Sequence, residues 1–280
     1  LNLRKGQYDE KLLELFGIPF AKDALPPLRK STDICGYITR EAAEQTGLKE
    51  GTPVAAGMFD IDACDIAVAA PEESQICMIA GTWSINEYVS EVPVTDGRVL
   101  MNSFSCIPNR YLIEESSATS AYNHAWFLQN LLPELKEQVE KQGKSIYDIT
   151  NEWVASISPK EFCPIYTPFL MASNMDPNGR ASFVGLNANH SRKHLMRSVY
   201  EGVAFSHRYH LEKLLAIRTK PLSCIRLAGG VARSPVWVQM FADVMKYPIE
   251  VVDIAETGAF GCAITAAIAC GDYESFEQAC

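Results

Sequence analysis

The chain has 280 residues, of which 48% are hydrophobic, and carries a formal net charge of −9. This length and apolar content suffice for one large hydrophobic core or two moderate ones. The acidic balance argues against a nucleic-acid-binding protein, which normally presents a basic face. No apolar run reaches the length of about 18 residues that a membrane span needs, and the polar segment 1–10 does not resemble a secretory signal.

The nine cysteines are expected to be free thiols rather than a disulfide framework. Cys64, Cys77, Cys224, Cys262 and Cys270 have small or aliphatic neighbours, which is typical of buried thiols in a reducing cytoplasm. The sequence contains no Cys-x-x-Cys pair and no histidine at zinc-finger spacing. We therefore predict a cytoplasmic protein without a metal site made of protein ligands.

The hydrophobic pattern predicts helices and strands along the whole chain. Expected helices cover 9–17, 38–46, 62–70, 121–132, 146–157, 192–217, 236–246 and 259–270, and expected strands cover 54–57, 76–79, 85–89, 99–104, 111–114, 224–228 and 249–252. A strand-rich first half followed by alternating strands and helices predicts an α/β fold with a mixed sheet flanked by helices.

The C-terminal part contains a strand that runs into Gly229 and Gly230 and then into a helix opened by Ser234 and Pro235. Paired glycines let a ligand approach the backbone closely. A serine cap with proline at the first helical position marks a helix start, where an anion or a polar ligand edge is favoured. Alone, the same pattern is also typical of a tight turn.

In two segments further upstream, a predicted strand also leads directly into polar or glycine residues. Residues 51–62 read as a short buried strand followed by Asp60 and Asp62, and residues 75–84 read as a strand that delivers Gly81-Thr82-Trp83-Ser84 into a turn. A carboxylate at the end of a buried strand lies where open α/β sheets bind ligands. From the residues alone, Asp60 could equally N-cap the next helix, and the Gly-Thr pair could be an ordinary hairpin turn.

These motifs, in this order, resemble those of the FGGY family of sugar kinases within the actin-like ATPase superfamily, and most of all its xylulose-kinase-like members. The segment 168–186, with Pro168-Phe-Leu and Asp176-Pro-Asn-Gly-Arg, also resembles the linker of that family. The four segments span nearly the whole chain. The resemblance implies a ribonuclease-H-like domain of the actin-like ATPase type that binds ATP with Mg²⁺.

The resemblance also implies roles for particular residues. Asp60 would be the catalytic base that deprotonates a sugar hydroxyl for in-line attack on the γ-phosphate. Asp62 would either hydrogen-bond sugar hydroxyls or cap the helix that follows, and we leave both open. The residues implied in ATP binding are Gly81, Thr82, Ser84, Gly229, Gly230 and Ser234. Residues 115–126 resemble a further nucleotide-bordering segment, although its glycines are replaced here by Ser116 and Ala121.

Family members carry two such domains, and the first phosphate loop, Asp-x-Gly-Thr after a strand, does not occur in this sequence, which begins with Leu1. We therefore expect residues 1–65 to be the tail of the first kinase domain, residues 66–280 to be the C-terminal nucleotide-binding domain, and the chain to be part of a longer polypeptide. Leu12, Leu13, Leu15 and Phe16 should then be poorly covered, which promotes association. We expect a homodimer or a partner chain, and no sugar kinase turnover from residues 1–280 alone.

The expected function is transfer of the γ-phosphate of ATP to a hydroxyl of a ketopentose or a related sugar or polyol. The expected partners are that substrate and ATP, with no nucleic acid and no membrane. The alternative is a non-catalytic nucleotide-binding module of the actin-like superfamily. Five histidines do not cluster in the sequence and are read as structural.

Overall fold

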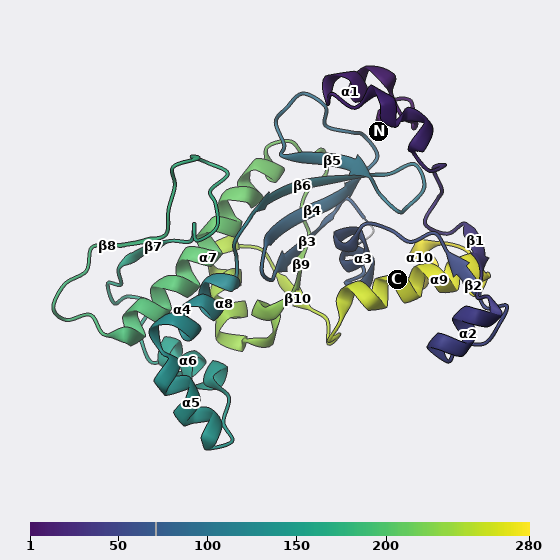
Figure 1. Cartoon of the computed structure of the whole chain (residues 1–280). Coiled ribbons are helices and arrows are strands. Elements are labelled where there is room, and N and C mark those ends of the chain that lie inside the picture. The colour runs from purple at the N-terminus through teal and green to yellow at the C-terminus, as the bar shows by residue number, and fades with distance from the viewer. Residues whose placement is uncertain (71) are drawn as a thin grey trace.

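A six-stranded mixed sheet forms the centre of the computed structural model, which describes residues 1–70 and 72–280 (Figure 1). Its strand order is β10-β9-β3-β4-β6-β5. The strands are β3 (Gln75–Ala80), β4 (Ser84–Ser90), β5 (Met101–Phe104), β6 (Tyr111–Ser117), β9 (Cys224–Ala228) and β10 (Ile249–Val251). Strands β3, β4, β6 and β5 are antiparallel neighbours, whereas β9 and β10 run parallel to β3. The predicted α/β fold with a mixed sheet is confirmed.

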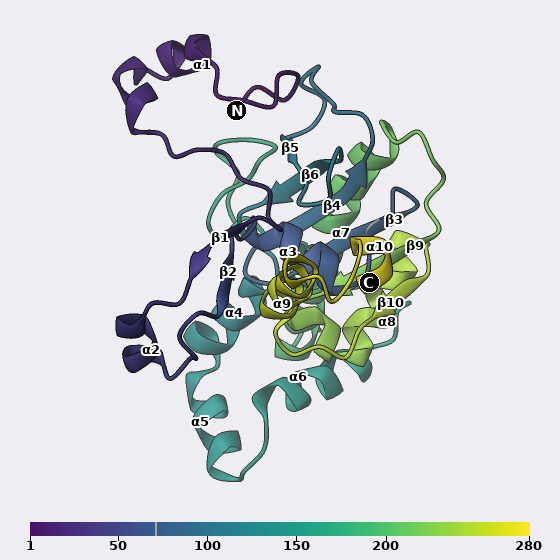
Figure 2. The same cartoon turned by 90° about the vertical axis from the view of Figure 1, so that its right-hand side faces the viewer.

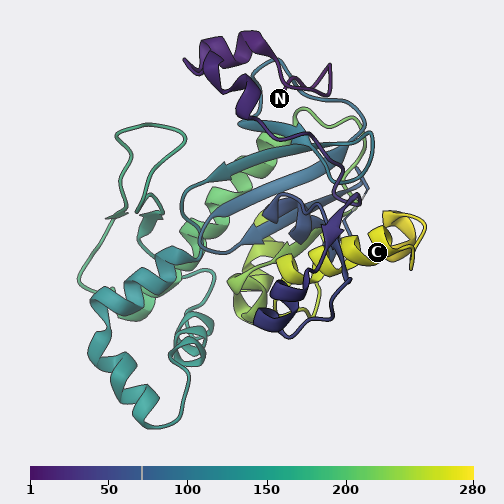
Figure 3. The ribbon, with the colours of Figure 1, turned by 45° about the vertical axis from the view of Figure 1, so that its right-hand side comes forward.

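One face of the sheet is covered by the long helix α7 (Arg192–Leu215), with α8 (Pro235–Met245) packed beside it. Alternate residues of the strands, such as Met78, Tyr88 and Ile113, form one core with Leu211 of α7 and Phe241 of α8. Helices α4 (Tyr122–Leu131), α5 (Pro133–Lys141) and α6 (Ile146–Ala155) continue this side and project away from the sheet (Figure 3). The crossover that makes β3 and β9 parallel runs through these helices.

The opposite face is covered by α3 (Asp60–Ala67) and α9 (Thr257–Cys270), which pack against each other (Figures 1 and 2). The short C-terminal helix α10 (Phe276–Ala279) adds Phe276 to a small core with Ile66, Val89 and Leu112. Val89 and Leu112 belong to β4 and β6, so each of these strands contributes side chains to both faces, as the period of two requires.

The N-terminal segment lies at the periphery of the domain, in α1 (Glu10–Leu15), η1 (Pro19–Ala24), α2 (Arg40–Thr46) and the hairpin of β1 (Ile34–Tyr37) with β2 (Pro53–Ala55). Leu15 and Phe16 are 73% and 78% exposed, as expected, whereas Leu12 and Leu13 are half-buried. A second small hairpin joins β7 (Ile165–Thr167) to β8 (Ser182–Val184), and η2 (Gly230–Arg233) precedes α8. Among the described residues, no helix is both long and apolar enough to cross a membrane.

The structure differs from the sequence-based expectations at several places, among them the unpredicted elements β1, β7, β8 and α10. The helix expected from residue 38 begins at Arg40, because residues 34–37 pair with β2 as a strand; its Thr39 cap and Gly47 end are found as predicted. Helix α5 was not predicted, although Pro133 stands at a position that favours helix initiation. All nine cysteines are free; of the five expected to be buried, Cys77 and Cys224 are buried, Cys64 is half-buried, and Cys262 and Cys270 on α9 are exposed.

The contact between α3 and α9 depends on Gly261. A Cβ atom at this position would lie 1.8 Å from the carbonyl oxygen of Ala63, so the helices approach with no room for a side chain. We therefore expect Gly261→Ala to lower the free energy of unfolding by about 1–3 kcal/mol, the usual cost of overpacking a core. Thermal or urea unfolding measures this change.

Gly258→Ala is the matched control on the same helix. Its added Cβ would meet only Cys64 Sγ, at 3.8 Å, which is an ordinary contact. Alanine favours helix by up to about 1 kcal/mol over glycine, so this variant should be neutral or more stable. Equal stability of the two variants would show that the α3–α9 contact is not as tight as the structure has it.

Candidate active site

The Gly81 turn and the Gly229 edge lie side by side, because β3 and β9 are parallel and end at the same edge of the sheet. Ile79 pairs with Ala228, one residue before Gly229. Gly229 has a φ of 87°, and a Cβ atom there would lie 2.7 Å from the carbonyl group of Ala80 and 2.9 Å from the nitrogen of Gly81. Only glycine fits this position, in both conformation and space.

A cavity of about 580 Å³ opens beside these two turns. Its lining comes from the β3–β4 turn, the starts of α4 and α6, and the η2–α8 segment. The lining residues are Gly81, Thr82, Ala121, Tyr122, His124, Ala125, Ser145, Tyr147, Asp148, Asn151, Tyr200, Gly230, Arg233, Ser234 and Trp237. Four of the six residues predicted to bind ATP, Gly81, Thr82, Gly230 and Ser234, therefore line one cavity. Its volume is within the usual range for a small-molecule site.

Aromatic rings form one wall of the cavity. His124 belongs to the segment 115–126 that resembles a nucleotide-bordering segment, whereas Tyr200 was not predicted. The rings of Tyr200 and Trp237 are stacked with centroids 3.9 Å apart, and His124 lies edge-on to both. The His124 ring bonds to Thr150 Oγ1 at 3.1 Å, and burial lowers the pKa of His124 to about 4, so this histidine is neutral at pH 7. An uncharged aromatic wall suits a planar, apolar ligand surface.

Ser234 caps α8 as the sequence predicted. Its hydroxyl accepts a hydrogen bond from the Trp237 backbone N–H at 3.3 Å and donates one to Asn151 Oδ1 at 2.7 Å. Asn151 Oδ1 also accepts from the Tyr200 hydroxyl at 2.9 Å. The predicted ATP ligand is thus mainly a link that fixes α6 and α7 to the start of α8.

Ser84, also predicted to bind phosphate, points away from the cavity. It is fully buried at the start of β4, and its hydroxyl lies 3.2 Å from His207 Nδ1 on α7. The reason is the strand period: Ser84 and Asn86 both face α7, and Asn86 Oδ1 lies 2.7 Å from the same nitrogen. Ser84 therefore belongs to a buried polar network and does not line the cavity.

This network supports the Gly81 turn from below. The Asn86 amide nitrogen donates to the carbonyl of Glu115, so its Oδ1 is the acceptor for His207 Nδ1–H, and His207 Nε2 accepts from the Ser120 hydroxyl at 2.8 Å. The backbone N–H of Ser120 donates to the Thr82 carbonyl at 2.8 Å. Burial lowers the pKa of His207 to about 3, so the network is uncharged at pH 7.

Asp60 is the first residue of α3, and Phe59 occupies the N-cap position, so Asp60 does not cap the helix. Its side chain is exposed, and Oδ1 accepts from the Ile61 backbone N–H at 2.9 Å. Among residues 1–70 and 72–280 this carboxylate has no other hydrogen-bond or ion-pair partner. Asp60 lies outside the cavity lining, on the helix that covers the opposite face of the sheet.

Asp62 is placed differently from both interpretations of the sequence. It is buried, and its carboxylate accepts hydrogen bonds from the Ser105 hydroxyl at 3.0 Å and the Cys106 backbone N–H at 2.5 Å. Burial raises the pKa of Asp62 to about 6. Asp62 therefore joins α3 to the loop that follows β5, rather than capping the helix or facing a ligand.

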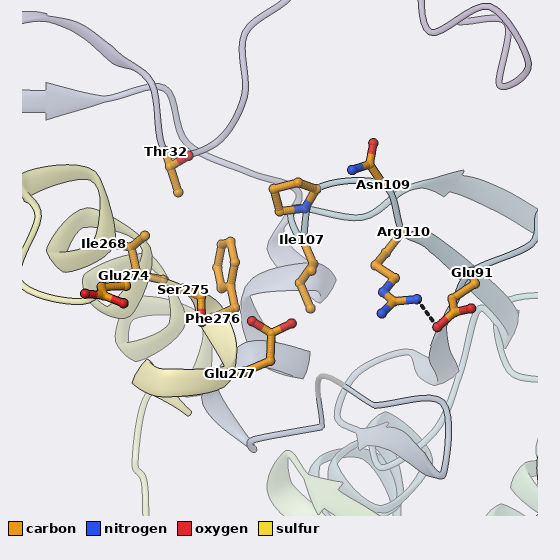
Figure 4. A pocket seen from close by; sticks show the side chains of 11 residues that line it. Thr32, Glu91, Ile107, Asn109, Arg110, Ile268, Glu274, Ser275, Phe276 and Glu277 are labelled. Carbon is orange, nitrogen blue, oxygen red and sulfur yellow. Dashed lines mark ion pairs between the residues drawn. The ribbon is translucent and has the colours of Figure 1, made fainter.

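A second cavity, of about 590 Å³, lies where the β5–β6 turn meets α10 (Figure 4). Carboxylates of Glu91, Glu274 and Glu277 line it, and Arg110, the only arginine among its described lining residues, is already paired with Glu91 at 2.5 Å. It shares no residue with the cavity beside Gly81 and Gly230. An acidic rim disfavours a phosphorylated ligand, so we assign the candidate active site to the glycine-lined cavity.

Two family models match the chain. The model of the C-terminal domain of the FGGY family of carbohydrate kinases matches residues 76–270, and the model of the N-terminal domain of the same family matches residues 1–66.

Among curated proteins, the chain is similar to a probable L-xylulose kinase of Haemophilus influenzae, with 37% identity over 95% of this chain and 52% of that protein. It is also similar to the L-xylulose/3-keto-L-gulonate kinase of Escherichia coli, with 34% identity over 99% of this chain and 54% of that protein. The chain thus spans about half the length of these relatives.

The chain also superposes on solved structures of kinases. A xylulose kinase from Rhodospirillum rubrum superposes with a TM-score of 0.78 at 26% identity, covering 99% of this chain and 55% of that one. A Plasmodium falciparum glycerol kinase with ADP superposes with a TM-score of 0.82 at 20% identity, over 99% of this chain and 54% of that one, which shows a shared fold. Because the family model of the C-terminal domain matches most of the chain, residues 76–270, the chain belongs to the FGGY family of carbohydrate kinases.

Proposed function

We propose that this chain supplies the nucleotide-binding half of an ATP-dependent sugar kinase that phosphorylates a ketopentose or a related sugar or polyol. The observation that carries the proposal is the convergence of Gly81, Thr82, Gly230 and Ser234 on one cavity with a stacked aromatic wall. L-Xylulose is the first substrate to test, because relatives at 34–37% identity are named for it.

The domain division belongs to the same proposal. We assign residues 1–65 to the tail of a first domain and residues 66–280 to the C-terminal domain, and the two family-model matches at 1–66 and 76–270 support this boundary. Coverage of about half of each relative fits a chain that works with a further domain. The exposed Leu15 and Phe16 would be covered by that domain or by a second copy.

The residues divide into three roles in the proposed reaction. Gly230 and the wall of Tyr200 and Trp237 would hold the adenosine. In the Gly81–Thr82 turn, the backbone N–H and hydroxyl of Thr82 would donate hydrogen bonds to phosphate oxygens, because the Gly81 N–H already donates to the Trp83 carbonyl at 3.2 Å. Asp60 would take the proton of the attacking sugar hydroxyl. Its exposed carboxylate has a free Oδ2 for this purpose, because only Oδ1 is engaged within the described chain.

We expect Mg²⁺ to accompany the nucleotide. Among the described residues that line the cavity, Arg233 is the single positively charged side chain, and the negative charge of Asp148 offsets it. A polyphosphate therefore finds little positive charge on the protein itself. A magnesium ion bound to the phosphates supplies the missing charge neutralisation.

The first test separates a kinase from a non-catalytic nucleotide-binding module. The full-length protein should form ADP far faster when a ketopentose is present than without sugar, because closure around the sugar excludes water and assembles the site. A coupled assay over pentuloses, hexuloses, polyols and gluconate identifies the substrate class. ATP binding without turnover on any member of the panel would favour the module.

The second test concerns the base. Asp60→Asn should lower kcat by about two to four orders of magnitude, which is the usual contribution of a positioned base, while ATP affinity and the melting temperature stay unchanged. Asp23→Asn, at an exposed carboxylate in η1, is the control and should retain activity. Turnover by the Asp60 variant within a few-fold of the wild type would remove Asp60 from the mechanism.

The third test concerns the nucleotide edge. No atom lies within 4 Å of a Cβ built at Gly230, so Gly230→Val should fold normally and place its side chain in the cavity. We expect ATP affinity to fall at least about tenfold, or 1.4 kcal/mol, with little change in sugar affinity. Calorimetric titration with each ligand measures both.

Gly229→Val is the contrasting variant, because its Cβ would collide with the Ala80 carbonyl and its backbone requires a positive φ. This variant should lose stability as well as ATP affinity. If Gly230→Val folds normally and binds ATP as tightly as the wild type, the adenosine does not lie against this edge.

A further inference from the structure

A row of acidic and thiol side chains lies on the sheet face beneath α3. Cys77 on β3 is the direct partner of Glu87 on β4, and Glu87 is the direct partner of Glu114 on β6. Directly paired residues point to the same face of a sheet, and like charges that face each other across strands are destabilising. The row therefore needs a source of positive charge or of protons.

Asp65 of α3 reaches the same place from above. Ligand atoms of Asp65, Cys77 and Glu87 lie within 4.8 Å of one another, and all three side chains are completely buried. Three secondary-structure elements thus bring two carboxylates and one thiol to a single point. The mechanism proposed above uses none of them.

The carboxylates in this cluster have no partners. Neither oxygen of Asp65 and neither oxygen of Glu87 makes a hydrogen bond within the described part of the chain, and no ion pair there includes them. A buried carboxylate without a partner costs several kcal/mol. Burial, together with the charge of neighbouring carboxylates, raises the pKa of both groups.

Protons alone do not resolve the cluster. Two protonated carboxyl groups could share hydrogen bonds with each other, but the nearby Glu114, whose Oε2 is also unpartnered, places a third buried carboxylate on the same face of the sheet. A cation would satisfy several of these atoms at once. Two carboxylate oxygens and one thiolate are three ligands, so a four-coordinate ion would need one further ligand to close the site.

We propose that Asp65, Cys77 and Glu87 form a structural site for a divalent metal ion of the zinc class. The thiol is a soft ligand that magnesium and calcium avoid, whereas zinc accepts sulfur and carboxylate oxygen together. Binding would deprotonate Cys77, since a coordinating thiol loses its proton to the solvent. This site is independent of the proposed kinase reaction.

The geometry is close to what zinc requires. Bonds of about 2.0–2.3 Å at tetrahedral angles place ligand atoms roughly 3.3–3.8 Å apart. The ligand atoms of the three side chains lie within 4.8 Å of one another, so side-chain rotations would bring them to the distances needed to bind an ion. Because the site is buried, the ion would be taken up during folding, and its binding energy would contribute to stability.

The site would fix α3 to the β3–β4 hairpin. Asp65 lies on the same helix as Asp60, and Cys77 lies on the strand that ends at Gly81. A metal ion would therefore hold the helix that carries the proposed base against the hairpin that carries the proposed phosphate turn. It would act on their relative position and not on the reacting atoms.

The test measures metal content in the full-length protein. Mass spectrometry should find zinc stoichiometric with the wild type, and refolding with Co²⁺ should give the near-ultraviolet absorption of a thiolate–cobalt bond. Cys77→Ser should abolish that absorption, and zinc affinity should fall at least about tenfold, since even outer-shell changes cost this much. Cys224→Ser, at a buried thiol on the neighbouring strand β9, should keep both.

Stability gives the second readout. A chelator should lower the melting temperature of the wild type, and zinc should restore it, with no such response in the Asp65→Asn/Glu87→Gln variant. Wild-type protein that neither carries zinc nor takes up cobalt on refolding would overturn the proposal, even if every variant fails to fold. A double variant more stable than the metal-treated wild type would also overturn it, because it would show a carboxyl pair that needs only neutralisation.

Discussion

The backbone contact between Gly229 and the Ala80–Gly81 peptide is the constraint on which the candidate site depends. It arises because β9 pairs in parallel with β3, so that two segments far apart in the sequence end at the same edge of the sheet. Because Gly229 has no Cβ atom, its backbone can touch the Ala80–Gly81 peptide. Its positive φ directs the chain into η2 and α8. That turn places Gly230 and Ser234 in the lining of the same cavity as Thr82.

The two faces of the sheet differ in electrostatic character. On the α7 side, His124 and His207 are kept neutral by burial, and the buried carboxylate of Glu115 is paired with His210 and Lys213. On the α3 side, Asp62, Asp65 and Glu87 are buried carboxylates. A nucleotide on the α7 side of the edge would thus meet backbone N–H groups and helix starts rather than basic side chains, in keeping with a chain of net charge −9.

Sequence reasoning predicted what depends on local pattern. The strand at 224–228, the paired glycines, and the cap formed by Ser234 and Pro235 are all found as predicted, because a few adjacent residues determine them. The directions of the Ser84 and Asp62 side chains could not be predicted, because each is set by partners elsewhere in the chain: His207 is 123 positions from Ser84, and Ser105 is 43 from Asp62. The aromatic wall is formed by side chains from separate helices, so the spacing of aromatic residues along the sequence does not predict it.

The alternation along β4 connects these features. Ser84, Asn86 and Tyr88 face α7, whereas Glu87 and Val89 face the α3 side. A shift of one residue in the pairing of β4 would exchange the neutral network beneath the Gly81 turn for the acidic cluster, so the register is strongly specified. Cys77 and Glu87 are direct partners in the observed pairing of β3 and β4. A metal ion bound to both side chains would therefore stabilise this register and no other. The acidic cluster, costly in isolation, would then favour the one register that supports the turn.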